Sequence, residues 1–163
     1  MVEGRGVLMT GSILHCPAIK IGPWGDDGGS TQDIEDASNI KYLKSFTIHS
    51  GSVVDSIRFS YTDYAGQTHR AGPWGGSGGL QVYTTQFNNS EFIIQVSGTI
   101  GTYGGVTSVT SLKFVSNLKT YGPWGLENGT PFTVRVQPMG AIVGFFARGG
   151  TYLTAIGVYV RSL

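Results

Sequence analysis

The residues whose chemistry stands out are a carboxylate and a set of glycines in short loops. Asp55 ends the segment GSVVD of residues 51–55, and Gly79 ends the segment GGSGG of residues 75–79. A carboxylate can accept charge-assisted hydrogen bonds from two neighbouring hydroxyls. A glycine loop can bring main-chain N–H groups close to the same hydroxyls because it lacks Cβ atoms. An acid facing such a loop would therefore hold a polyhydroxylated ring without proton transfer and without a metal.

Other catalytic or metal-binding patterns are weak. His15, His49 and His69 lack the spacing of metal ligands, and the lone Cys16 cannot form an internal disulfide or a cysteine-based zinc site. Residues 75–79 match the serine hydrolase pattern G-x-S-x-G. That motif needs a helix after the serine, whereas the residues that follow have the composition of a strand. We therefore expect no cofactor, no metal and no enzymatic activity.

Composition and charge exclude several classes of partner. A chain of 163 residues is long enough for one domain of ordinary size. Its 11 basic and 10 acidic residues give a net charge of +1, so no basic field attracts nucleic acid. No apolar run approaches the roughly 20 residues of a membrane helix, so membrane insertion is not expected. The first residues lack the basic start and continuous apolar core of a secretory signal, so we expect a cytoplasmic or nuclear protein.

The chain contains an internal repeat. The tetrapeptide GPWG occurs three times, at residues 22–25, 72–75 and 122–125, so successive copies are 50 residues apart. A period of this size indicates one supersecondary unit used repeatedly. The units fill residues 18–163, which we predict to form one domain. Residues 1–17 are predicted to be a leader or linker outside it.

The segments between the turns predict β-strands. Val, Ile, Thr, Tyr and Phe dominate them, and no segment of helical length shows a 3.6-residue apolar rhythm. Four short strands in each of three units predict an all-β fold of about 12 strands, with three four-stranded sheets around one core. A β-trefoil, which also has three units, is the alternative. Trp24, Trp74 and Trp124 are expected to pack in the core.

At this point the sequence resembles the jacalin-related lectins of plants, in particular the mannose-binding, single-chain kind. The resemblance covers about residues 18–162. It implies a β-prism I fold of three Greek-key sheets in which the first strand pairs with the C-terminal segment. It also implies metal-independent binding of mono- or oligosaccharides and glycoproteins, with a role in plant defence. Because residues precede the first unit, the mannose/glucose class is favoured over the galactose class, whose members carry a cleaved N-terminal glycine. The matching segments are IGPWG (21–25), GGS (28–30), YGPWG (121–125), GTPF (129–132), VGFFARGG (143–150) and LTAIGVY (153–159).

The resembling family holds its sugar between a G-x-x-x-D loop and a Gly-Gly loop. Residues 51–55 carry the full G-x-x-x-D pattern, and by the family's geometry they face the loop of residues 75–79. The favoured carbohydrate-binding residues are therefore Ser52, Val53, Asp55 and Gly79.

A second candidate site is degenerate. The loop of residues 150–154 reads GTYLT and would face Gly29, at the principal sugar position of such lectins, but Thr154 stands where the acid is expected. Loss of a carboxylate that accepts two hydroxyls costs about tenfold to a hundredfold in affinity. Thr151 and Tyr152 lie in the same loop, and the Tyr152 ring is a candidate to stack on a sugar. The second unit also lacks the acid, so a third site is expected to be empty.

Three alternatives remain at the level of sequence. Asp55 is an equally good residue for capping a turn. The Thr154 loop could instead confer galactose-type specificity, or the protein could be an interaction module that has lost sugar binding. A single shallow site binds weakly, so useful avidity would need several sites or a homodimer.

Overall fold

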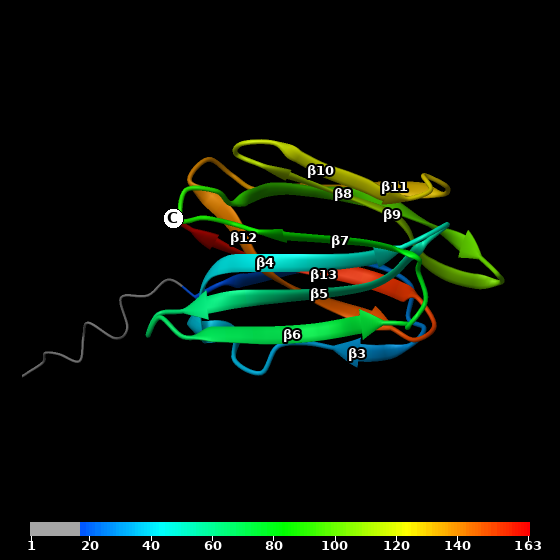
Figure 1. Cartoon of the computed structure of the whole chain (residues 1–163), viewed down its shortest axis with the longest axis horizontal. Helices are drawn as coiled ribbons and strands as arrows, with labels where there is room; N and C mark the ends of the chain where they lie inside the picture. The colour runs from blue at the N-terminus through cyan, green and yellow to red at the C-terminus, as the bar shows by residue number, and fades with distance from the viewer. Residues whose placement is uncertain (1–16) are drawn as a thin grey trace, which may run out of the picture.

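The computed structural model describes residues 17–163, and these form an all-β domain (Figure 1). The predicted leader or linker, with His15 and Cys16, lies outside the described residues except for residue 17. The described part contains 12 strands and a single short 3-10 turn at Ala37–Asn39, so the prediction of an all-β fold is confirmed. The strands are β2 (Ile19–Gly25), β3 (Ser30–Gln32), β4 (Ile40–Ser50), β5 (Val54–Asp63), β6 (Thr68–Gly75), β7 (Gln81–Gln86), β8 (Ile93–Tyr103), β9 (Val106–Ser116), β10 (Thr120–Gly125), β11 (Thr130–Arg135), β12 (Gly140–Gly149) and β13 (Leu153–Ser162).

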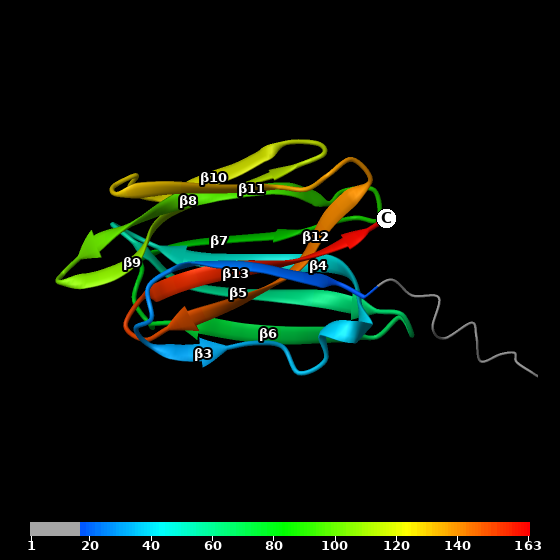
Figure 2. The same ribbon diagram turned by 180° about the vertical axis from the view of Figure 1, so that it is seen from behind.

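Strand pairing follows the repeat. Three long hairpins, β4–β5, β8–β9 and β12–β13, each carry one outer strand on either side. The outer pairs are β6 and β7, β10 and β11, and β2 and β3, so the first strands of the domain pair with the C-terminal hairpin, as expected (Figure 2).

The arrangement differs from the prediction of three separate sheets in one respect. Ile142 of β12 pairs with Ile93 of β8, and this single residue pair joins two of the four-stranded groups into one eight-stranded sheet. The third group, with strand order β6-β5-β4-β7, remains a separate sheet.

The core lies where the inner faces of the three hairpins meet. Phe46 of β4, Phe114 of β9 and Phe145 of β12 are fully buried. Phe114 stacks on Phe145 with ring centroids 5.3 Å apart, and Phe46 meets Phe114 edge to face at 5.0 Å. Aromatic side chains bury large areas and favour these two geometries, so one residue from each hairpin ties the three groups together.

Two of the three repeat tryptophans pack in the core as predicted, and the third packs against its edge. Trp74 and Trp124 are 6% and 8% exposed and belong to the core, whereas the half-buried Trp24 stacks on Phe132 at 5.5 Å. Each is paired with a residue of the neighbouring long strand: Trp24 with Ile156, Trp74 with Ile57, and Trp124 with Leu112. The three GPWG segments therefore occupy equivalent places in the three groups.

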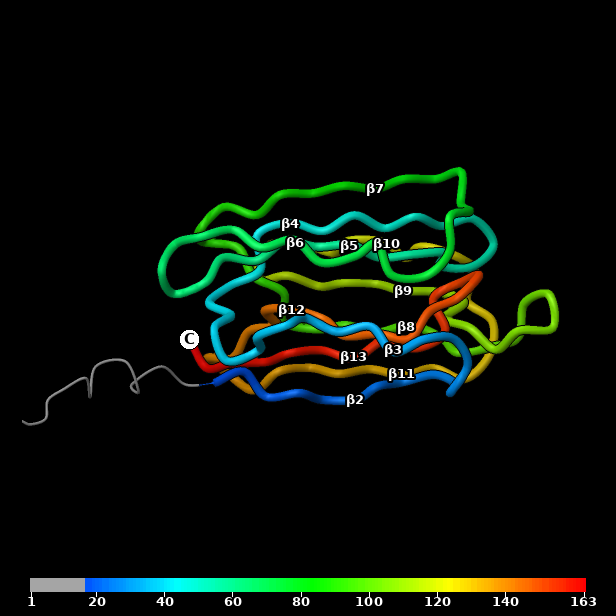
Figure 3. The backbone as a smooth tube through the Cα atoms, turned by 90° about the horizontal axis from the view of Figure 1, so that it is seen from below, coloured from blue at the N-terminus to red at the C-terminus, as the bar shows by residue number. Residues whose placement is uncertain are grey.

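The turns of interest gather at one end of the molecule. The described chain starts beside the C-terminus at the opposite end, and the β8–β9 hairpin extends beyond the other turns at the loop end (Figure 3). This loop end brings together turns that belong to different repeats.

Candidate functional site

The last glycine of each GPWG segment allows the loop that follows it to lie against the neighbouring long strand. A Cβ on Gly75 would lie 2.1 Å from the carbonyl oxygen of Asp55, so only glycine allows this approach. Gly25 and Gly125 lie equally close to the carbonyl oxygens of Thr154 and Thr110. The residue after each glycine then donates its N–H to that same carbonyl, at 2.8–3.0 Å. Asp55, Thr154 and Thr110 are thus structurally equivalent, each two residues before the partner of a repeat tryptophan.

Asp55 differs from its two counterparts in having no protein partner for its side chain. The residue is 5% exposed, yet within residues 17–163 no group forms a hydrogen bond or ion pair with its carboxylate. The turn-capping role that aspartate often takes is therefore not seen here. Burial raises the pKa of the Asp55 carboxyl, against a smaller opposing effect of His49. The carboxylate is partly desolvated and faces the groove, so a ligand that brings donors would form charge-assisted hydrogen bonds with it.

The glycine loop lies directly against this carboxylate. A Cβ on Gly78 would be 2.9 Å from Asp55 Oδ2, and one on Gly79 would be 2.8 Å from Oδ1. Gly79 also has a φ of +89°, a conformation that side-chain-bearing residues rarely adopt. The structure thus brings together two of the predicted residues, Asp55 and Gly79, although they belong to different repeats.

A groove of about 1130 Å³ opens at this point. Ser52 is exposed at its edge, and Val53, which is 2% exposed, also lines it. The four residues of the favoured site therefore share one concave surface. The rest of the lining comes from the loop of residues 75–81 and from three other turns.

Thr151 and Tyr152 line the Asp55 groove, whereas the sequence analysis grouped them with Thr154 and Gly29. The cause is contact between loops of different repeats. Gly76 lies so close to the Thr151 carbonyl that a Cβ would be 1.7 Å from its oxygen. The neighbouring Tyr152 ring then packs edge to face on Tyr103, with centroids 5.4 Å apart.

Tyr103 and Leu126 line the groove and were not found by sequence reasoning. Tyr103 is 39% exposed and stands at the tip of the β8–β9 hairpin, directly before Gly104. The glycine pair after it marks the turn, but no spacing in the sequence indicates that this turn reaches the loop of another repeat.

The loop at Thr154 is closed by its own hydrogen bonds. Thr154 is 2% exposed, and its hydroxyl donates to the Gly28 carbonyl at 2.7 Å. The Gly28 N–H donates to the Asp26 carboxylate at 3.2 Å. In the second unit Thr110 likewise donates to the Asn128 carbonyl at 2.6 Å. At both loops the side chain at the position equivalent to Asp55 is hydrogen-bonded to the facing loop, whereas the Asp55 side chain is not.

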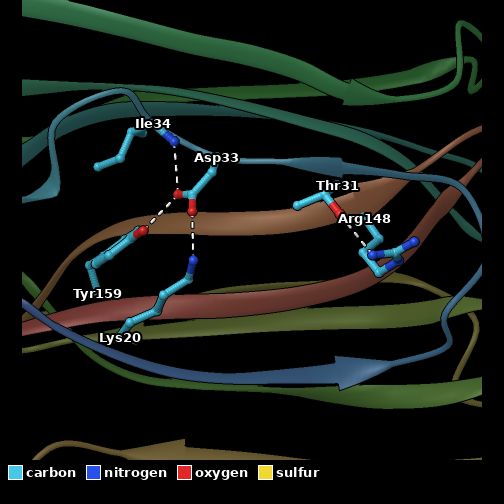
Figure 4. A network of polar contacts seen from close by, with 6 residues as sticks. All are labelled: Lys20, Thr31, Asp33, Ile34, Arg148 and Tyr159. Atoms are coloured by element: carbon cyan, nitrogen blue, oxygen red, sulfur yellow. Dashed lines mark hydrogen bonds and ion pairs between the residues drawn. The ribbon is translucent and has the colours of Figure 1, made fainter.

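Arg148 adds further closure at the Gly29 loop. Its guanidinium donates to the carbonyl oxygens of Gly28 and Gly29, at 3.3 and 2.9 Å. It also donates to the Thr31 hydroxyl at 2.8 Å (Figure 4). Charge-assisted hydrogen bonds of this kind are stronger than neutral ones, so the loop is fixed from within the protein.

The segment that follows β3 is anchored by Asp33 (Figure 4). Its carboxylate accepts from Lys20 Nζ and from the Tyr159 hydroxyl, both at 2.6 Å, and from the Ile34 N–H at 2.8 Å. Burial alone would raise the pKa of Asp33, but these hydrogen bonds outweigh it and hold that pKa below its usual value. The pKa of Tyr159 is raised by the burial of its own hydroxyl and by the neighbouring Asp33 carboxylate.

The remaining chemical candidates do not assemble into a catalytic site in the described part of the chain. Ser77 lies between β6 and the strand β7, so the helix that a nucleophilic serine elbow needs does not follow it. His69 pairs with Asp63 at 2.7 Å, away from the groove. Residues 17–163 contain no cluster of three or more His, Cys, Asp or Glu side chains placed to hold a metal ion. None of their helices is long and apolar enough to span a membrane.

These features define a carbohydrate-binding class of protein. The family model described as the jacalin-like lectin domain matches residues 21–159, and the chain belongs to this family. Horcolin from Hordeum vulgare is 39% identical over 143 residues, which cover 87% of this chain and 96% of horcolin. A mannose/glucose-specific lectin from Parkia pendula is 36% identical over 88% of this chain, but the match is 31% of that protein. The solved structure of AcmJRL, a mannose-binding jacalin-related lectin from Ananas comosus, is 41% identical and covers 90% of this chain and 99% of its own, with a TM-score of 0.84.

Proposed function

We propose that this lectin binds mannose- or glucose-type sugars, without a metal, in the groove between Asp55 and the loop of residues 75–79. The observation that carries the proposal is the Asp55 carboxylate, which lines the groove beside Gly78 and Gly79 and has no hydrogen-bond partner in the described protein. The names of its relatives, which include mannose-binding lectins, support the same sugar class.

Binding follows from what each group offers a sugar. Two neighbouring hydroxyls donate to the Asp55 carboxylate, and main-chain N–H groups of the glycine loop donate to sugar oxygens. The Tyr103–Tyr152 pair offers an aromatic wall for the apolar face of a ring. Burial partly desolvates the carboxylate, and sugar hydroxyls supply hydrogen bonds that the described protein does not.

The Thr154 loop, with Gly29, contributes little under this proposal. Its threonine hydroxyl and the Gly28 N–H are engaged within the protein, and Arg148 holds the adjoining carbonyls. The scaffold of the proposal is a three-sheet β-prism, in which three related loop ends surround one axis and a single one is open.

Titration calorimetry with methyl α-mannoside tests the assignment. Asp55→Asn keeps the size of the side chain but removes the charge, so we expect the affinity to fall about tenfold to a hundredfold. Thr154→Val is the matched control at the equivalent position, and its mannose affinity should stay at the wild-type value. Unchanged binding in Asp55→Asn would refute the site.

A glycan array distinguishes the alternatives. Binding to mannose-rich glycans supports the proposal. Binding to galactose or N-acetylgalactosamine alone would instead favour altered specificity, and no binding to any glycan would favour a protein-interaction module.

A further inference from the structure

The outer face of the β6-β5-β4-β7 sheet carries a concave surface that is not lined by any carboxylate of the described residues. This hollow has a volume of about 490 Å³. Its polar side chains include Lys44, Ser45, Arg58, Ser60, Thr68 and Arg70, which we call the anion hollow. We propose that the anion hollow binds a sulfate or phosphate ester carried on a saccharide, independently of the Asp55 groove.

Strand register places the three cations next to one another. Arg70 of β6 is paired with Ser60 of β5, and Arg58 lies two residues before Ser60 on the same strand. Residues two apart on a strand share a face, so Arg58 and Arg70 are diagonal neighbours within reach of long side chains. Lys44 reaches across β5 and donates to the Thr68 hydroxyl at 3.0 Å. Thr68 precedes Arg70 by two residues, so Lys44 joins the same group.

The cations of the hollow have no carboxylate partner inside it. Within residues 17–163, neither Arg58 nor Arg70 has a hydrogen bond or ion pair, and no carboxylate lines the hollow. Arg70 also borders a neighbouring cavity lined by Asp33, Glu35 and Asp36, whereas Arg58 does not. Other basic side chains are engaged, for example Lys20 with Asp33 and Arg148 with the Gly29 loop. Neighbouring like charges repel each other, and a bound oxyanion would relieve that repulsion. Arg forks also match the oxygens of phosphate and similar anions.

The floor of the hollow is polar. The hydroxyls of Ser45 and Ser60 are hydrogen-bonded to each other at 2.5 Å, on adjacent strands below the cations. A hydroxyl pair gives an anion further donors and offers no apolar surface to a lipid chain. This composition favours a compact, strongly hydrated anionic group.

The other two strand groups serve as internal comparisons. Counted from the repeat tryptophan, Arg70 corresponds to Lys20 and Thr120, and Arg58 corresponds to Gly157 and Lys113. Each of the other two strand groups therefore has a cation at only one of the two equivalent positions, Lys20 in one group and Lys113 in the other. Lys20 is neutralised by Asp33 at 2.6 Å, and the hollow beside Lys113 also contains Glu127. In the described part of the chain, the β6-β5-β4-β7 face thus has cations at both equivalent positions, and its hollow contains no carboxylate.

Calorimetry with charged probes tests the proposal. The probes are a heparin-derived hexasaccharide, its fully desulfated counterpart and inositol hexakisphosphate. Because all contacts involve exposed charges, binding should weaken as salt is raised. The double variant Arg58→Gln, Arg70→Gln should lose about tenfold to a hundredfold in affinity for the charged probes. Lys113→Gln, which removes a cation at the equivalent place, should bind them within about twofold of wild type.

The outcomes separate this site from the proposed sugar site. Binding of the sulfated probe alone assigns a sulfate ester, binding of the phosphate probe alone assigns a phosphate ester, and binding of both assigns either anion. Saturating methyl α-mannoside should not compete, and Asp55→Asn should bind the charged probes like wild type. The proposal is overturned if neither probe binds, if mannoside competes, or if Lys113→Gln weakens binding as much as the double variant. Thermal melting of the double variant should match wild type, since both arginines are exposed.

Discussion

Asp55, Thr110 and Thr154 occupy the same place in three repeats, but their side chains have different fates. The two threonines donate to carbonyls of the facing loops, whereas the aspartate has no protein donor within the described residues. A carboxylate cannot donate to a carbonyl, so the aspartate cannot close its loop in the way that the threonines do. A single difference of residue type therefore separates an open loop end from two closed ones.

The pH dependence of binding should report the state of Asp55. Burial raises its pKa in the sugar-free protein, and the ionised form is the one that accepts two hydroxyls. We expect mannoside affinity to fall on acidification, with the fall beginning above the ordinary aspartate pKa of about 3.9. Calorimetry between pH 7 and pH 4 measures this. A profile that stays flat down to the ordinary pKa would contradict it.

The contribution of Asp55 to the stability of the sugar-free fold should change with pH in the opposite direction to the mannoside affinity. Because the folded-state pKa of Asp55 is raised above its unfolded value, the ionised group lowers the stability of the sugar-free fold at neutral pH. This cost is full above the folded-state pKa and disappears as the pH falls from there to the unfolded value. We expect Asp55→Asn to unfold at a higher denaturant concentration than wild type at pH 7, with the difference closing in acid. A less stable variant at pH 7 would argue against the desolvated carboxylate.

At the scale of elements, the strands were predictable and the meeting of loops was not. Alternating and β-branched residues indicated the strands, and the GPWG repeat indicated three equivalent units. The grouping of Thr151 and Tyr152 with Thr154 followed chain order, but contact with Gly76 places them in the Asp55 groove. Sequence spacing reports neighbours along the chain, whereas these loops are far apart in the sequence and meet only in the folded protein. For the same reason, the sequence alone does not identify Tyr103 as part of the Asp55 groove.

The glycine loop offers a sharp test of loop packing. Gly79→Ala would place a Cβ 2.8 Å from Asp55 Oδ1 and 2.9 Å from the Ser50 nitrogen, at a φ of +89°. We expect mannoside affinity to fall more than about tenfold and stability to fall by about 1–3 kcal/mol. Gly66→Ala is the matched control, because Gly66 has a φ of +85° but open space around it. The Gly66→Ala variant should lose stability only through backbone strain, and its mannoside affinity in calorimetry should equal that of wild type.

At the scale of the whole molecule, threefold repetition builds the scaffold, and loops of different repeats meet at the one proposed site. The core unites Phe46, Phe114 and Phe145 from three hairpins, and this packing depends on a regular pattern that sequence reasoning can follow. The number of sheets was harder to predict, because the single pair of Ile142 with Ile93 decides whether two groups count as one. The anion hollow likewise depends on cross-strand register, which composition does not reveal.

The number of bound sugars is a property of the whole molecule. With the Thr154 and Thr110 loops closed, we expect one methyl α-mannoside per chain in calorimetry. Thr154→Val should leave that number unchanged while lowering stability by about 1 kcal/mol, because the Gly28 carbonyl loses a donor. Two sugars per chain would show that a second loop end is open.

The contacts of Gly25, Gly75 and Gly125 have a consequence for how such a protein can change over generations. Each loop is held by a main-chain N–H and a main-chain carbonyl, and neither depends on which side chain stands at positions 154, 55 or 110. These main-chain contacts are therefore compatible with either residue type, although Thr154 and Thr110 add side-chain hydrogen bonds of their own. The same main-chain frame accepts an aspartate at one position and threonines at the other two, so a change of side chain alters what a loop can bind while the frame stays in place.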